Sequence, residues 1–378
     1  MHVLFLPSSY PDSDRPIKGI FFREQACTLR SAGFNVGVVT SKIEVGTTRK
    51  VERYNDDGIE TIFGYVPPLP TLFGMGNLAL LTASFYKLFR EYEARYGTPD
   101  IIHVQSAVSS GPAALQIFRR CGVPYVITEH SSGFEREVIR PLHLALLRKV
   151  FESAAGLAVV SPALGEALER TIGRCASSWK WIPNMVDPLF FRPAGAHTGT
   201  PFRFLNVGWL EKYKGHDDLL RAFAMAFTDK DDVELSFGGD GELSNYLRDL
   251  SSDLGIQRRV KFLGVLSRSE VLSQVQSCDA FVLPSHVETF GVVLIEAMAC
   301  GKPCVATACG GPQHIVDDKS GFLVPVGDVK ALASAMTELR AKIDSYDEVR
   351  IRERCLEKFG PERLVENLTN LYGDALKA

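Results

Sequence analysis

The sequence predicts an α/β protein of two doubly wound, Rossmann-like domains, and three observations lead to this class. The chain has 378 residues, which suits two domains of about 150 residues each better than one. Apolar residues make up 46% and charged residues 23%, a globular composition that excludes intrinsic disorder. Short apolar segments alternate with helical patterns, which is typical of a mainly parallel sheet with helices on both faces.

The first half of the chain contains seven candidate strands with helical patterns between them. The strands are expected at residues 2–6, 35–39, 59–64, 101–104, 125–128, 157–160 and 179–182. The clearest helices are expected at residues 19–32, 77–96, 112–121 and 162–170. The 77–96 segment repeats large apolar residues at helical spacing, so we expect a core-facing helix, with contact to a membrane or a lipid-linked acceptor as the alternative.

A second series of strands and helices follows a loop rich in proline and glycine. Its strands are expected at residues 202–207, 234–238, 260–263, 280–283, 303–306 and 321–324, and its helices at 215–227, 242–252, 268–277, 292–299 and 329–342. We therefore expect domains at 1–195 and 196–360, facing each other across a cleft. Residues 361–378 carry leucines at spacings of four and three, which predicts a last helix.

Charge and cysteine content exclude several classes of protein. Lys and Arg total 42 and Asp and Glu total 45, so the net charge of −3 indicates no nucleic-acid partner. The N-terminus lacks the cationic start and the length of a signal peptide, so we expect a cytoplasmic protein with reduced thiols. No two of the eight cysteines form a C-x-x-C pair, and Cys300, Cys304 and Cys309 are interpreted as small apolar residues rather than metal ligands.

Ligands of doubly wound sheets bind beyond the carboxyl ends of the strands, and the densest set of polar residues follows strand 280–283. Glu288 lies in the loop, Gly291 precedes a helix, and Glu296 lies within that helix. Free N–H groups and the helix dipole at residues 290–292 suit a phosphate, and a carboxylate in such a unit suits ribose hydroxyls. The alternatives are a helix-capping acid at Glu288 and a solvated acid at Glu296.

Two other strand ends carry candidate side chains. After strand 202–207, Lys214 either balances a diphosphate or is a solvated surface lysine. After strand 125–128, His130 either hydrogen-bonds a sugar hydroxyl or is a structural histidine. Residues 238–241 are Gly-Gly-Asp-Gly and lack the third glycine of a dinucleotide fingerprint, so a dinucleotide site is only weakly indicated.

Several motifs occur in a fixed order along the chain. They are Gly19-Ile20-Phe21-x2-Glu24-Gln25-Ala26, Ile182-Pro183-Asn184-x-Val186-Asp187, Val207-Gly208-x-Leu210-x3-Lys214-Gly215, Gly238-Gly239-Asp240-Gly241-Glu242, Glu288-x-Phe290-Gly291-x4-Glu296, Gly310-Gly311-Pro312-x3-Val316 and Ser320-Gly321-Phe322-Leu323-Val324. With these motifs the chain resembles the retaining glycosyltransferases of glycosyltransferase family 4, which have the GT-B fold. The resemblance extends over nearly the whole length.

The resemblance implies transfer of a sugar from a nucleotide diphosphate sugar to an acceptor hydroxyl, with retention at the anomeric carbon. Its implied catalytic residues are His130 beside the reacting sugar, Lys214 at the diphosphate and Glu288 at the donor sugar hydroxyls. Glu296 would hold the ribose. The other implied donor contacts are Gly19, Gly208, Trp209, Gly239, Gly264, Val265, Leu266, Phe290, Gly291 and Val292. Trp209 stands where the family often has arginine, so Lys212 and Arg268 are candidate replacements for that cation.

The resemblance also implies partners and a location. Domain 1–195 would bind the acceptor, domain 196–360 the nucleotide sugar, and helix 361–378 would pack back on the first domain. A hexosyl or hexosaminyl donor is implied, UDP-sugar rather than GDP-sugar, with no essential metal or other cofactor. The implied acceptor is a glycan or lipid-linked glycan of a bacterial surface polysaccharide, with peripheral contact at the inner face of the cytoplasmic membrane.

Two alternatives to sugar transfer remain on the same architecture. One is a nucleotide-sugar epimerase, which needs acid and base groups around the sugar. The other is a non-catalytic module that binds a nucleotide sugar.

Overall fold

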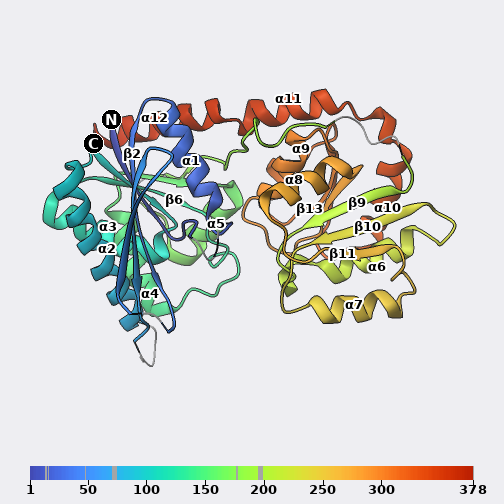
Figure 1. The fold of residues 1–378 in the computed structure, drawn as a ribbon, viewed down its shortest axis with the longest axis horizontal. Coiled ribbons are helices and arrows are strands. Elements are labelled where there is room, and N and C mark those ends of the chain that lie inside the picture. The colour runs from blue at the N-terminus through green and yellow to red at the C-terminus, as the bar shows by residue number, and fades with distance from the viewer. Residues whose placement is uncertain are drawn as a thin grey trace. The chain divides into compact units, whose positions relative to one another are not determined.

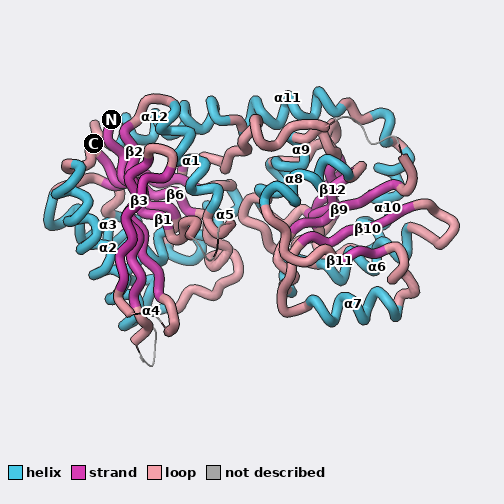
Figure 2. The backbone as a smooth tube through the Cα atoms, viewed as in Figure 1, coloured by secondary structure: helices cyan, strands magenta, loops and turns pink. Residues whose placement is uncertain are grey.

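The computed structural model describes residues 1–378 apart from 13, 14, 16, 47, 70–74, 176, 177, 195–198 and 378. These residues form two compact units, one of Met1–Pro183 with Pro361–Ala378 and one of Asn184–Gly360. In each unit the strands gather into a sheet between helices (Figures 1 and 2). The expected two-domain α/β class with mainly parallel sheets is therefore confirmed. In the described part of the chain, no helix has the length and apolar character needed to cross a membrane.

The first unit contains an eight-stranded sheet in the order β3-β4-β2-β1-β5-β6-β7-β8. Its strands are β1 (His2–Pro7), β2 (Asn35–Ile43), β3 (Lys50–Asp56), β4 (Ile59–Val66), β5 (Ile101–Gln105), β6 (Tyr125–Glu129), β7 (Gly156–Val159) and β8 (Lys180–Trp181). Every pairing is parallel except that of β3, which is antiparallel to β4. The central strands β5 and β6 are buried at every position, as expected for strands of a parallel sheet that helices cover on both faces.

Helices cover both faces of this sheet. They are α1 (Ile20–Ser31), α2 (Met75–Tyr96), α3 (Ala107–Cys121), α4 (Pro141–Glu152), α5 (Pro162–Ile172) and α12 (Pro361–Ala375). Helices α2, α3 and α4 pack side by side on one face, and α1 packs with α12 on the other (Figure 1). The α2 helix buries Leu78, Phe85 and Leu88, as expected for a core-facing helix.

The last helix packs within the first unit although it is the end of the chain. It contacts α1, β6 and β7. The Tyr372 hydroxyl lies 2.7 Å from Nδ1 of His103, whose Nε2 lies 2.8 Å from the Thr128 hydroxyl. Near the exposed edge, Lys180 pairs with Asp374 at 2.5 Å. Polar contacts inside the unit thus add to apolar packing in holding α12.

The second unit contains a six-stranded, wholly parallel sheet in the order β11-β10-β9-β12-β13-β14. Its strands are β9 (Phe202–Val207), β10 (Val233–Gly238), β11 (Val260–Phe262), β12 (Ala280–Leu283), β13 (Cys304–Thr307) and β14 (Gly321–Val324). Its helices are α6 (His216–Ala226), α7 (Ser244–Asp253), α8 (Arg268–Ser277), α9 (Val292–Ala299), α10 (Val329–Ala341) and α11 (Glu348–Phe359), with short 3-10 turns η1 (Lys212–Lys214), η2 (Gly311–His314) and η3 (Ile343–Ser345). Helix α6 packs with α7 and α10, and α9 packs with α11.

Three described elements were absent from the sequence expectations. Strand β3 is charged and mostly exposed, so it lacks the apolar run by which the other strands are recognised. Helix α4 has an apolar residue, Leu142, that is 63% exposed, so its apolar residues do not mark a single buried face. Helix α11 is rich in charge and buries only a narrow stripe, formed by Ile351, Cys355 and Phe359.

The boundary between the units differs from the expected one. Residue 195 lies outside the described residues, and the units divide between Pro183 and Asn184. The segment after the division is tied to the second unit, because Val186 N–H donates to the Phe359 carbonyl at 3.0 Å. In addition, the Arg352 guanidinium donates to the carbonyls of Phe191 and Pro188, at 2.7 and 2.9 Å.

Candidate active site

The candidate residues of the second unit follow strands that end at one edge of the sheet. Val207 at the end of β9 pairs with Gly238 at the end of β10, and Leu283 at the end of β12 pairs with Ala306 of β13. Because all six strands are parallel, the loops after their carboxyl ends emerge on the same side. This edge carries both of the expected acidic residues and the expected lysine.

Lys214 and Glu288 form an ion pair across two of these loops. Nζ of Lys214, in η1, donates to Oε2 of Glu288 at 2.7 Å, and the two side chains are only 19% and 15% exposed. The alternative of a solvated lysine is therefore wrong. Burial lowers the pKa of Lys214, but the Glu288 carboxylate more than offsets this effect, so the pKa lies above its ordinary value. Lys214 is a protonated cation at neutral pH.

Close backbone approaches hold the loops of this pair. The His286 N–H donates to the Tyr213 carbonyl at 2.8 Å, which joins the β12 loop to η1. A Cβ atom on Gly215 would lie 2.1 Å from the Pro284 carbonyl oxygen, so only glycine fits there. On the other side, the Gly311 N–H donates to the Glu288 carbonyl at 2.9 Å.

The start of α9 lies directly after Glu288. Gly291, its N-cap, has φ 104°, a left-handed conformation that favours glycine. The adjacent Phe290 is buried and meets the ring of Phe359 edge-on at 5.6 Å. The first N–H groups of a helix have no intrahelical partner, so residues 291–293 form a site where an anion is favoured.

Glu296 lies on the next turn of α9 and is 4% exposed, so the alternative of a solvated acid is wrong. Nη1 of Arg268, in α8, donates to its Oε1 at 2.8 Å. Burial raises the pKa of Glu296, and Arg268 opposes that rise. Arg268, one of the two candidate replacements for the arginine that the family often has at position 209, is thus engaged by this carboxylate.

Glycines bring the remaining loops of this edge together. The Gly239 N–H donates to the Gly264 carbonyl at 2.7 Å, and a Cβ on Gly239 would lie 2.0 Å from the Gly208 carbonyl oxygen. Leu266 packs beside Gly238. Trp209 and Val265 are more than half exposed, at 54% and 57%. Trp209 and Val265 are therefore accessible positions of these loops.

His130 and Gly19, in the first unit, also lie at a carboxyl edge. Gly19 has φ 79° and starts α1, and a Cβ there would lie 2.6 Å from the Ser9 carbonyl oxygen. His130 follows β6 and meets the ring of Phe22 edge-on at 5.0 Å, so the start of α1 and the histidine are neighbours. The structure thus places these two candidates together in the first unit and all the others in the second.

His130 is held as an uncharged side chain. Its Nε2 lies 2.6 Å from Oε1 of Gln105, and burial lowers its pKa to about 3. The preceding carboxylate, Glu129, accepts hydrogen bonds from the N–H groups of Ala107, His130 and Ser131, at 2.9, 2.9 and 2.8 Å. This edge therefore presents hydrogen-bonded polar groups rather than a free cation at His130.

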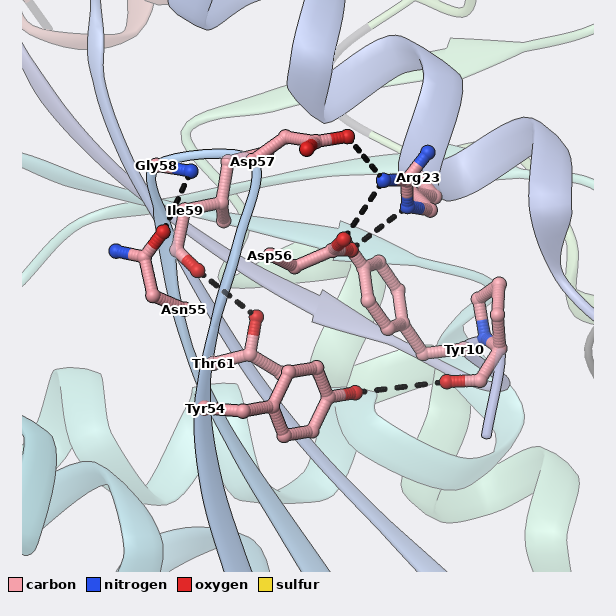
Figure 3. Close-up of polar contacts among 10 residues, drawn as sticks. Tyr10, Arg23, Tyr54, Asn55, Asp56, Asp57, Gly58, Ile59 and Thr61 are labelled. Atoms are coloured by element: carbon pink, nitrogen blue, oxygen red, sulfur yellow. Dashed lines mark hydrogen bonds and ion pairs between the residues drawn. The ribbon is translucent and has the colours of Figure 1, made fainter. Parts of the chain in front are cut away.

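A polar cluster that the sequence did not reveal holds the loop after β1 (Figure 3). Arg23 of α1 binds Asp56 through both Nε and Nη2, each at 2.7 Å. The hydroxyl of the buried Tyr10 donates to the same carboxylate at 3.0 Å. Nη2 of Arg23 also reaches Asp57 at 2.5 Å. The β3–β4 turn therefore fixes the loop and the first turn of α1, where Gly19 lies.

Comparison with known proteins identifies the family. A model described as Glycosyltransferase Family 4 matches residues 19–189, and one described as Glycosyl transferases group 1 matches residues 189–352. The chain belongs to glycosyltransferase family 4. Together the two models span both units of this glycosyltransferase.

Individual relatives agree with this assignment. The chain is 27% identical to a glycogen synthase of Mycobacterium tuberculosis over 355 residues, which are 89% of this chain and 85% of the relative. Among solved structures, sucrose-phosphate synthase from Thermosynechococcus elongatus matches with a TM-score of 0.81 at 23% identity and covers 100% of both chains. The Anabaena protein HepE in complex with UDP-glucose matches with a TM-score of 0.75 at 20% identity, over 97% of this chain and 98% of that one. These two structures have the same fold as this glycosyltransferase.

The cysteines of this glycosyltransferase are all free thiols. Cys300 and Cys304 are buried in the second unit, in keeping with their interpretation as small apolar residues. In the described part of the chain, no group of three or more His, Cys, Asp or Glu side chains is arranged to hold a metal ion.

Proposed function

We propose that this glycosyltransferase moves a sugar from a nucleotide diphosphate sugar to an acceptor hydroxyl, with retention at the anomeric carbon. The observation that carries the proposal is the pair of ion pairs at one sheet edge, Lys214 with Glu288 and Arg268 with Glu296, around the start of α9. A diphosphate needs cationic and N–H partners, and sugar and ribose hydroxyls need acceptors, so this edge offers each group that the donor requires.

The proposed chemistry breaks the bond between the anomeric carbon and the diphosphate oxygen, through an oxocarbenium-like transition state. Lys214 and the N–H groups at residues 291–293 stabilise the charge that develops on the leaving diphosphate. The acceptor oxygen bonds to the anomeric carbon on the same face, and its proton passes to the departing phosphate. Glu288 holds the donor sugar hydroxyls. His130, being uncharged, acts through its backbone carbonyl or a hydrogen bond.

We propose that the reaction needs no metal ion. A divalent cation in such reactions neutralises the leaving diphosphate, and here Lys214 and the dipole of α9 supply positive charge at the same edge. Activity retained in excess EDTA would agree with this assignment. Activity lost in EDTA and restored by Mg²⁺ or Mn²⁺ would contradict it.

The donor that we propose is a UDP-hexose or UDP-hexosamine, and the acceptor is a glycan or lipid-linked glycan of a bacterial surface polysaccharide. HepE, which shares the fold, was solved with UDP-glucose. We place the acceptor on the first unit and expect the enzyme to work at the inner face of the cytoplasmic membrane. The acceptor class follows from analogy with the family.

The test begins with thermal unfolding of the protein against UDP-, GDP- and ADP-sugars. A ligand at 100 times its Kd adds about 2.7 kcal/mol of stability, which moves the unfolding temperature clearly. The stabilising donor is then incubated with acceptor glycans, and the anomeric configuration of the product is read by NMR. We expect retention, and a loss of turnover of about 100-fold or more in Glu288→Gln.

Three outcomes would overturn the proposal. Inversion at the anomeric carbon would refute retention. An epimerised nucleotide sugar formed without acceptor would identify an epimerase. Tight donor binding with neither transfer nor slow donor hydrolysis would identify a binding module.

A further inference from the structure

The ribose end of the proposed site contains an arginine whose setting is unusually well defined. Arg268 opens α8, a helix that begins with a full capping box between Ser267 and Glu270. Its guanidinium reaches across to α9 and donates to Oε1 of Glu296 at 2.8 Å. The backbone of the arginine is thus fixed by the cap, and its head is fixed by the carboxylate.

Two aromatic rings from a distant segment hold the same guanidinium. The ring centroids of Phe190 and Phe191 lie 5.3 and 4.8 Å from its central carbon, within the range of a cation–π contact. Arg352 in turn donates to the carbonyls of Pro188 and Phe191 and so fixes that segment. A chain of contacts from α11 to α9 therefore orients Arg268.

The geometry divides the two oxygens of Glu296 between different tasks. Arg268 takes Oε1, and no hydrogen bond to Oε2 is formed by any of the described residues. A carboxylate oxygen accepts hydrogen bonds only, so Oε2 is suited to a donor such as a hydroxyl. Because Glu296 is 4% exposed, its charge is costly to keep without a cationic partner.

The charged surroundings of Glu296 are simple. From α8 only Arg268 acts on it, and at the C-cap of α9 the Cys300 thiol lies close enough for the charge of Glu296 to contribute to raising the pKa of that thiol. From α11, Arg352 lies near the end of α9 but donates to backbone carbonyls, including that of Ala299. The ionisation of Glu296 therefore depends on one residue.

We propose that Arg268 is the positioning residue of the nucleotide end of the site: it keeps Glu296 ionised and turned so that Oε2 accepts a ribose hydroxyl. This inference rests on the proposed function, because it takes the ribose as the ligand of Glu296. In this role Arg268 acts through Glu296 and does not contact the diphosphate. The sequence had instead suggested Arg268 as a candidate cation for the diphosphate.

The test measures binding of UDP, ADP and GDP by calorimetry between pH 6 and pH 8. Wild type should bind at least one of the three, and its pH profile is the reference, because the terminal phosphate itself titrates near a pKa of about 6. Relative to wild type, Arg268→Met should raise the Kd about tenfold at pH 7 and further toward pH 6, up to about tenfold per pH unit, since one proton on Glu296 opposes binding. Arg268→Lys keeps the charge and should keep the wild-type pH profile.

Two further variants separate this role from a general effect on the fold. Arg340, in the last turn of α10, also pairs with an acid, Asp231 at 3.2 Å, and lies over the ring of Phe227. Both of these partners precede β10, at the opposite edge of the sheet from the candidate site. Arg340→Met should leave the Kd within about twofold of wild type. The double variant Arg268→Met/Glu296→Gln removes both charges and should bind no more weakly than Glu296→Gln alone.

Three results would contradict the role proposed for Arg268. A Kd in Arg268→Met that matches wild type at every pH would overturn this inference while leaving the proposed function intact. An equally large loss on adding Arg268→Met to Glu296→Gln would overturn it too, because the arginine would then act independently of the carboxylate. Failure of wild type to bind any of the three nucleotides would overturn both the inference and the proposed function.

Discussion

The carboxyl edges of the two sheets are built from different chemistry. At the edge of the first sheet, His130 is uncharged and hydrogen-bonded to Gln105, and Glu129 faces three backbone N–H groups. At the edge of the second sheet, Lys214 and Glu296 belong to two partly buried ion pairs, one with Glu288 and one with Arg268. Both sheets are mainly parallel, but the two ion pairs of the candidate site lie at the edge of the second, so the groups that we assign to the charged diphosphate are concentrated in one unit.

Removal of the cation from the second edge should have the largest effect. Lys214→Ala deletes the ammonium group that we assign to the leaving diphosphate, so turnover should fall about 10²- to 10³-fold. Lys261→Ala is the matched control, because Lys261 also pairs with a carboxylate, Glu234 at 2.6 Å, but on an exposed strand face. Steady-state rates of sugar transfer check both variants. Equal rates in Lys214→Ala and wild type would show that the Lys214 ammonium group does not stabilise the leaving diphosphate.

Acid should destabilise the first unit more strongly than the second. Burial lowers the pKa of His103 and of His130 to about 3, against an ordinary 6.5, whereas in the second unit His216 falls to about 4. Below pH 6.5 these histidines bind protons in the unfolded chain but stay neutral in the folded unit. Stability should therefore fall as pH drops from about 6.5 toward 3, by about 1.4 kcal/mol per pH unit for each histidine.

Tryptophan fluorescence can follow this loss in the first unit alone. The chain has three tryptophans, and Trp209→Phe leaves only Trp179 and Trp181, both in the first unit. Urea unfolding of that variant should show a clearly lower midpoint at pH 5.5 than at pH 7. Identical midpoints would mean that the two histidines are not buried in the neutral form.

The docking of α12 gives a smaller effect in the same unit. Tyr372→Phe removes the hydroxyl that contacts Nδ1 of the fully buried His103, so the free energy of unfolding should fall by about 1–2 kcal/mol. Tyr246→Phe, at a tyrosine that is 47% exposed in the second unit, should change it by less than about 0.5 kcal/mol. Urea titration at pH 7 measures both, and equal effects would show that the contact adds nothing to the docking of α12.

The polar cluster of Figure 3 should give the smallest effect. Asp56→Asn weakens the two-point contact with Arg23 and should cost about 1 kcal/mol, because the pair is partly exposed. Its neighbour Asp57 is 75% exposed, so Asp57→Asn should cost less. The same urea titration compares the two, and a larger effect at Asp57 would assign the anchoring of the loop to the wrong carboxylate.

Sequence patterns were sufficient for most of the fold but not for all of it. Strands such as β5 and β12 are short, fully buried and mostly apolar, so their sequences are sufficient to predict them. Strand β3 and helix α11 have mostly charged surfaces, and their form depends on partners that the local sequence does not reveal. The antiparallel β3–β4 hairpin matters nonetheless, because Asp56 at its turn anchors the start of α1.

The candidate site shows the same division between local and distant information. The order of glycines, acids and lysine at strand ends was enough to single out Lys214, Glu288 and Glu296 as candidates. Which residues pair with one another was not predictable, since Lys214 and Glu288 are 74 positions apart and meet only in the folded second unit. The sequence offered Arg268, with Lys212, as a candidate cation for the diphosphate, whereas the structure pairs Arg268 with Glu296.

Hydrogen exchange measured by mass spectrometry, with and without saturating UDP, tests most directly whether the charged edge of the second unit holds the nucleotide diphosphate. We expect slower exchange in peptides that cover residues 208–216 and 286–296. Slower exchange only in peptides of the first unit, or no change at saturating nucleotide, would contradict it.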